Sequence, residues 1–187
     1  MLEFNVYSKQ REKFSLQKFE DYCRSLNLDI TLDSDFELET WEGGFLPVRF
    51  SDARFADQDG NCEFSTGFEV YYEHFEPKAS GAVGFFKKLF RKKAQHDDPF
   101  SEAAEKGYTC MISLVCGAMD SFEVLMALVF SGYFVKMYGG AFEDPQSEWQ
   151  CQSFSELEAE IDVIIGELLS QKESGELLTH TLQDDEQ

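Results

Sequence analysis

The stretch that decides the fold runs from Tyr108 to Trp149 and reads YTCMISLVCGAMDSFEVLMALVFSGYFVKMYGGAFEDPQSEW. Its first part, Tyr108 to Cys116, is almost continuously apolar, which is typical of a strand in the middle of a sheet. Residues 121–138 follow with apolar side chains on most sides, and this predicts a buried helix that ends at the glycine pair Gly139-Gly140. A short edge segment is expected around Trp149. The rest of the chain is expected to cover this unit.

The segments on either side supply more strands and two more helices. Residues 2–8 alternate in hydrophobicity and predict a strand, while helical spacing after Ser15 predicts a helix to about Leu26. Residues 28–75 contain short alternating runs separated by turn residues, which predicts three or four antiparallel strands. A last helix is expected from about Ser153 to Lys172. This order predicts an α+β fold: a largely antiparallel sheet with three main helices packed mostly on one side.

We expect one domain over residues 1–173, with a flexible basic insertion at about 77–107 and a frayed acidic tail at 174–187. Within the insertion, Phe85 to Lys93 reads FFKKLFRKK. This segment would be amphipathic as a helix, and such a helix can rest on an anionic membrane or in an acidic groove. The simpler interpretation is a solvated loop, and membrane contact through residues 85–93 is left open.

Composition and charge narrow the class of protein. The chain has 187 residues, of which 43% are hydrophobic and 15% aromatic, and its net charge is −20. This is globular composition, and the charge argues against binding to nucleic acid, whose phosphates it repels. The charge favours a cationic protein partner, metal ions, or simply a soluble acidic protein. The N-terminus lacks the apolar region of a signal peptide, and the run around Val124 to Val135 is short for a membrane span, so we predict a cytoplasmic protein.

The sequence contains no recognisable catalytic motif. The phosphate-binding, dinucleotide-binding, nucleophile-elbow and zinc-protease patterns are missing from the sequence. Asp57 to Asn61 resembles a calcium loop, but its glycine stands at the fourth position and Phe68 at the twelfth, so no metal or cofactor is predicted. The five cysteines form no C-x-x-C pair, which predicts free thiols in a reducing compartment. We therefore expect a protein that is not an enzyme.

The acidic residues are the best functional candidates. Several lie between Asp29 and Glu42 without a lysine or arginine, and a strand here would bring Asp33, Asp35, Glu37 and Glu39 to one sheet face. A row of like charges is relieved by a cationic partner, although a solvated face is the simpler alternative. The last helix carries a second acidic face. The predicted partner-binding residues are Asp33, Asp35, Glu37, Glu39, Glu42, Glu156 and Glu160.

Three short motifs carry a family resemblance: GFLPV at residues 44–48, TGFEVY at residues 66–71 and GGAFEDPQ at residues 139–146. Together they resemble immunity proteins of bacterial polymorphic toxin systems, over about residues 44–150. The resemblance implies an α+β domain that binds a cognate toxin and blocks it. The basic segment at 85–93 is not part of this pattern. The alternative is a small-ligand-binding protein or enzyme with a carboxylate site near Glu69, Glu73 and His74.

Overall fold

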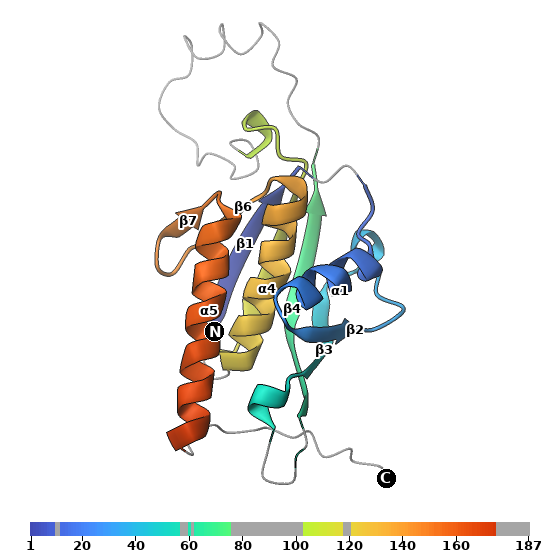
Figure 1. Cartoon of the computed structure of the whole chain (residues 1–187). Helices are drawn as coiled ribbons and strands as arrows, with labels where there is room; N and C mark the ends of the chain where they lie inside the picture. The colour runs from blue at the N-terminus through green and yellow to red at the C-terminus, as the bar shows by residue number, and fades with distance from the viewer. Residues whose placement is uncertain (10–11, 57–59, 61, 76–102, 118–120, 175–187) are drawn as a thin grey trace, which may run out of the picture.

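The computed structural model describes residues 1–9, 12–56, 60, 62–75, 103–117 and 121–174 (Figure 1). The basic segment at 85–93, most of the predicted insertion and tail, and most of the calcium-like loop at 57–61 lie outside the described residues.

Seven strands form one antiparallel sheet. They are β1 (Leu2–Ser8), β2 (Asp29–Leu32), β3 (Gly44–Ser51), β4 (Glu63–His74), β5 (Cys110–Cys116), β6 (Ala141–Asp144) and β7 (Trp149–Cys151). Their order is β2-β3-β4-β5-β1-β6-β7, so β5 is the central strand that its apolar run predicted, and β7 is an edge strand. The predicted α+β class with an antiparallel sheet is confirmed.

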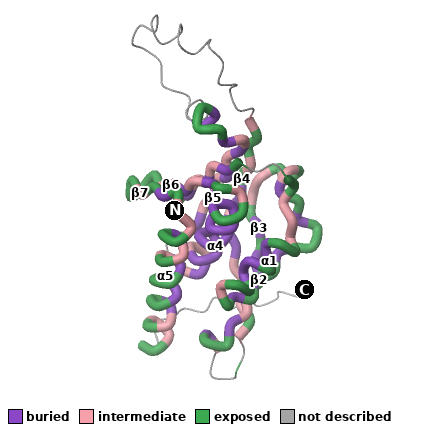
Figure 2. The backbone as a smooth tube through the Cα atoms, turned by 45° about the horizontal axis from the view of Figure 1, so that its top comes forward, coloured by how far each residue is buried: buried purple, intermediate pink, exposed green. Residues whose placement is uncertain are grey.

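Three main helices cover one face of this sheet (Figure 1). They are α1 (Leu16–Ser25), α4 (Ser121–Tyr138) and α5 (Phe154–Ser174). The central helix α4 lies over β1, β4 and β5, and it has α5 on one side and α1 on the other. Figure 2 shows the consequence: α4 is buried along most of its length, while α5 exposes its outer side. By length and composition α4 would pass for a membrane span, yet most of it is buried inside the protein, as expected of a core helix.

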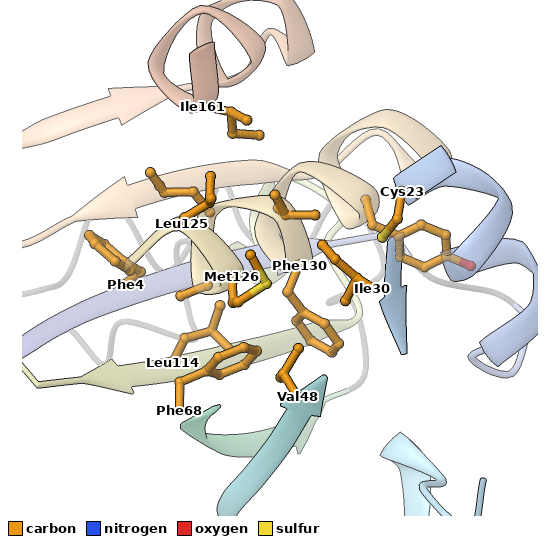
Figure 3. Close-up of a cluster of buried hydrophobic side chains, with 14 of the residues drawn as sticks. Phe4, Cys23, Ile30, Val48, Phe68, Leu114, Leu125, Met126, Phe130 and Ile161 are labelled. Carbon is orange, nitrogen blue, oxygen red and sulfur yellow. The ribbon is translucent and has the colours of Figure 1, made fainter. Parts of the chain in front are cut away.

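The core between helices and sheet is rich in aromatic rings. Phe130 on α4 is fully buried, and its ring contacts those of Phe14, Phe19, Phe36, Phe68 and Phe134. Figure 3 shows Phe130 beside Val48 and Phe68 from the sheet. Several of these rings meet edge to face or at a tilt, which are the favoured geometries of packed aromatic pairs. The described phenylalanines around Phe130 therefore build much of the contact between α4 and its surroundings.

The strand expected at Asp33 to Glu39 does not form. β2 ends at Leu32, the chain turns at Ser34 and Asp35, and residues Leu38–Thr40 form the short 3₁₀ helix η1. Phe36 and Leu38 are buried in the core, and their burial holds this segment in a loop instead of a strand of the sheet. The Asp33 carboxylate stabilises the turn by accepting a hydrogen bond from the Asp35 backbone N–H at 3.0 Å. The prediction that Asp33, Asp35, Glu37 and Glu39 share one sheet face is therefore wrong.

Candidate functional site

The sheet face opposite the helices is the candidate site, and we call it the open face. Along β1, β3 and β5, buried side chains on the helix side alternate with exposed or half-buried ones, and the pairing register places the residues of the neighbouring strands on the same two faces. The second set makes up the open face. Its charged members are Glu3, Asp29, Glu63, Glu69, Glu73 and Glu143, together with the basic residue Arg49. The open face is therefore strongly acidic.

Two aromatic side chains stand on this acidic face. Phe45 on β3 is 56% exposed and Tyr71 on β4 is 43% exposed. Each ring lies over a glycine of the neighbouring segment. A methyl group at Gly67 would come within 2.4 Å of the Phe45 ring, and one at Gly43 within 2.7 Å of the Tyr71 ring. These two glycines let the rings lie close to the backbone, which restricts their freedom.

Glu69 lies between the two rings and is tied to one of them. It is the cross-strand partner of Phe45, and its Oε2 accepts a hydrogen bond from the Tyr71 hydroxyl at 2.6 Å. That hydrogen bond to a carboxylate raises the pKa of Tyr71, because it stabilises the protonated phenol. Ion pairs between described residues include Lys18 with Glu12, Arg24 with Glu20 and Asp21, and Arg54 with Asp52, and none of these involves Glu69. Glu69 therefore presents its carboxylate on a face whose other charged residues are mostly acidic.

This contact can be tested by titration. Replacing Glu69 with glutamine is expected to lower the pKa of Tyr71, because the amide carries no negative charge to hold the phenolic proton. The measurement is tyrosinate absorbance against pH, with the Tyr71→Phe variant subtracted to isolate the Tyr71 signal. Glu73→Gln is the matched control on the same strand and face. An equal change of the Tyr71 pKa in both variants would contradict the contact.

The middle of the open face is uncharged. Met111, Ser113 and Val115 project from β5 on this side and are half-buried. The Ser113 hydroxyl donates to the Asn5 side-chain oxygen at 2.7 Å, so these polar groups satisfy each other. Carboxylates of β4 flank this neutral strip on one side, and Glu3 and Glu143 lie on the other. A partner can thus meet a neutral centre with acidic borders.

A hollow of about 210 Å³ marks the β6 and β7 end of the open face. Tyr7, Tyr108, Lys106, Glu143 and Gln150 are among its lining residues. Glu143 is held there by the Tyr7 hydroxyl at 3.3 Å and by the Gln150 side-chain amide at 2.8 Å. Because the hollow combines an acidic and a basic side chain, its charge selects no one kind of ligand. The hollow gives this end of the open face a concave shape.

The structure spreads the predicted partner-binding residues over two places. Asp33, Asp35, Glu37, Glu39 and Glu42 lie in one loop between β2 and β3. Glu156 and Glu160 lie on α5, at the other end of the helix layer. In the loop, Glu39 faces inward enough to accept a hydrogen bond from the Phe14 backbone N–H at 2.6 Å. The two groups are therefore two separate acidic surfaces, and neither belongs to the strands of the open face.

The alternative carboxylate site is not assembled as expected. Glu69 and Glu73 share the open face, but four residues of extended strand separate them by about 13 Å. His74 follows Glu73 directly, so its side chain points to the other face of the sheet. The three side chains do not converge on one point, and none of them lines the hollow.

The cysteines and the possible metal ligands form no further chemical site among the described residues. All five cysteines have free thiols, and Cys110 and Cys116 are buried as predicted. Burial raises the pKa of the Cys151 thiol to about 11, which keeps it protonated near neutral pH. Among the described residues, no three His, Cys, Asp or Glu side chains gather where a metal ion could bind.

Sequence reasoning missed the most distinctive residues of the open face. Phe45, Tyr71, Glu3 and Glu143 were not among the predicted binding residues. The motifs GFLPV and TGFEVY contained a signal for the two aromatic residues. In each motif a glycine is combined with an aromatic residue, and glycine inside a strand often marks a place that another group approaches closely. Strand pairing was needed to show that the ring of one motif lies over the glycine of the other.

Comparisons with protein-family models, with curated protein sequences and with solved structures found no significant match to this chain.

Proposed function

We propose that this protein is a cytosolic, immunity-type protein that binds a cognate, cationic bacterial toxin domain and blocks it by occlusion. The observation that carries the proposal is the open face, on which acidic side chains surround exposed aromatic rings and a neutral centre. The sequence resemblance to immunity proteins of polymorphic toxin systems supports the same class of protein.

The dimensions of the open face suit a protein partner. Seven strands at a spacing of ~4.8 Å make the face about 30 Å wide. A standard protein interface buries roughly 800 Å² on each partner, which a face of this width can supply. A shallow, extended surface of this kind covers a partner's site and does not enclose a small molecule.

The charge of the open face favours a cationic partner. Acidic side chains on the face and a net charge of −20 on the whole chain attract a cationic surface and accelerate its association. A second copy of the chain, docked through the same face, would bring like charges together. Exposed aromatic rings, here on β3 and β4 beside the neutral strip, are among the residues that most often dominate binding energy.

The function is tested with the product of the neighbouring gene. Expressed alone, this product is expected to slow growth, and co-expression of the present chain is expected to restore it. The two proteins should co-purify, and their affinity should fall as salt is added, because the attraction between exposed charges is screened. A harmless neighbouring product that forms no complex would contradict the proposal.

The binding surface is identified with three charge-matched variants. Glu3, Glu69 and Glu73 are changed together to glutamine on the open face. The first control changes Asp33, Asp35 and Glu42 to their amides, and the second changes Glu156, Glu160 and Glu167. Each variant removes three negative charges, so overall electrostatics change equally. About a tenfold loss of affinity confined to the open-face variant is expected, whereas a loss confined to either control would move the site to the surface predicted from the sequence.

A further inference from the structure

We propose that Phe45, Glu69 and Tyr71 form an anchor site for an arginine side chain of the bound protein. We call these three residues the aromatic–carboxylate cluster. This inference rests on the proposed function, because it specifies how a cationic partner is recognised on the open face. The site takes a guanidinium group, with the planar ion lying against the rings and donating to the Glu69 carboxylate.

The cluster is held in position before any partner binds. Phe45 projects from β3 and covers Gly67 of β4, while Tyr71 projects from β4 and covers Gly43 just before β3. The ring from each strand therefore lies against a glycine in or next to the other strand. A built methyl at Gly67 would also meet the Leu46 carbonyl oxygen at 2.5 Å, so a side chain there is incompatible with this close approach. Rigid rings lose little freedom on binding, which favours affinity.

The Glu69 carboxylate is oriented by its neighbours. Tyr71 donates to Oε2, and the described residues donate no hydrogen bond to Oε1. Across the sheet Glu69 faces the apolar side chains of Phe45 and Val115 and no basic residue. A positive charge that arrives here meets a carboxylate already oriented by the Tyr71 hydroxyl, and a charge-assisted hydrogen bond is stronger than a neutral one.

Arginine matches this site better than lysine. Its guanidinium group is planar, stacks on aromatic faces and gives several donors in a fixed plane. It is also more weakly hydrated than an ammonium group, so it costs less to bring against exposed rings. Directly opposed residues on antiparallel strands lie about 5 Å apart, and residues two apart on one strand lie about 7 Å apart. One guanidinium group can therefore touch Glu69 and a ring together.

The site is tested on the isolated full-length chain with two singly charged probes. N-acetyl-arginine methylamide and N-acetyl-lysine methylamide are titrated at low salt into ¹⁵N-labelled protein, and amide chemical shifts are followed by NMR. The arginine probe is expected to cause saturable shifts centred on Phe45, Glu69 and Tyr71, and the lysine probe to bind several-fold more weakly. Equal binding of both probes, or shifts centred on the 33–42 loop or on α5, would overturn the proposal.

Matched variants separate the site from general electrostatics. Glu69→Gln and Phe45→Leu are each expected to weaken arginine binding about tenfold, whereas Glu156→Gln, which removes the same charge from α5, is expected to leave it unchanged. Thermal melts that match the wild type establish that the variants are folded, and Tyr71→Leu provides a second ring variant. Equal affinities of Glu69→Gln and Glu156→Gln would overturn the proposal.

The two proposals fail in different ways. Arginine binding at the cluster together with a harmless neighbouring gene product supports the arginine site and contradicts the immunity function. A toxin complex that Glu69→Gln and Phe45→Leu leave as tight as the wild type supports the immunity function and overturns the anchor site.

Discussion

Replacing Phe130 with alanine is expected to lower the free energy of unfolding by about 3–5 kcal/mol. Phe130 is 0% exposed, and its ring touches rings from α1, from the 33–42 loop, from β4 and from its own helix. The truncation removes buried apolar surface and leaves a cavity where these elements meet. Urea unfolding followed by the fluorescence of Trp41 and Trp149 measures the loss.

Phe45→Ala is the matched control for that measurement. The same side chain is removed, but Phe45 is 56% exposed on the open face, so little apolar surface returns to water. Its expected cost is below about 1 kcal/mol, as for most changes at exposed positions. Similar losses in the two variants would contradict the assignment of the core to the helix side of the sheet.

Gly132→Ala is expected to destabilise the protein by about 1–3 kcal/mol, although alanine is a better helix former than glycine by about 1 kcal/mol. Gly132 lies inside α4, where a methyl group would meet the Tyr22 hydroxyl oxygen at 2.4 Å. The next nearest atoms are Phe154 Cε2 at 3.4 Å and Tyr22 Cζ at 3.6 Å, which are ordinary contacts. The Tyr22 hydroxyl is therefore the one close obstacle among the described atoms.

Removing that obstacle is expected to reverse the effect. The Tyr22 hydroxyl is buried without a hydrogen-bond partner among the described residues, so Tyr22→Phe should leave stability unchanged or increase it. In the double variant the alanine methyl group occupies the space that the Tyr22 hydroxyl leaves. The higher helix propensity of alanine then adds to the free energy of unfolding. Stabilities of the wild type, the two single variants and the double variant form a cycle whose coupling should favour the double variant by about 1–3 kcal/mol. Additive effects within about 0.5 kcal/mol would contradict the contact.

Local patterns predicted most of the fold. The alternation of residues 2–8 became β1, the helical spacing after Ser15 became α1, and the apolar run from Tyr108 to Trp149 became β5, α4, β6 and the edge strand β7. Such patterns work because burial on one face imposes a period of two residues on a strand and of 3.6 on a helix. The segment from Asp33 to Glu39 failed because its alternation has another cause. Phe36 and Leu38 anchor a loop to the core there, while Asp33, Asp35 and Glu37 are exposed.

The candidate site was less predictable than the fold. Net charge indicated a cationic partner, yet the acidic residues chosen from the sequence lie on a loop and on α5. The open face gathers acidic residues from β1, β2, β4 and β6, which are far apart in the chain. No local period reveals which of these strands become neighbours, because that depends on pairing across long sequence separations.

The sequence by itself determined the α+β class, the position of β5 and α4 at the centre, and the acidic character of the chain. These properties follow from composition and from short-range periodicity, which every residue carries wherever its neighbours lie. Only the tertiary structure decided that Phe45 and Tyr71 lie over Gly67 and Gly43 on the open face, among acidic residues from four strands. The physical reason is that strand pairing and helix packing join residues distant in the sequence, and these contacts determine which side chains share a surface.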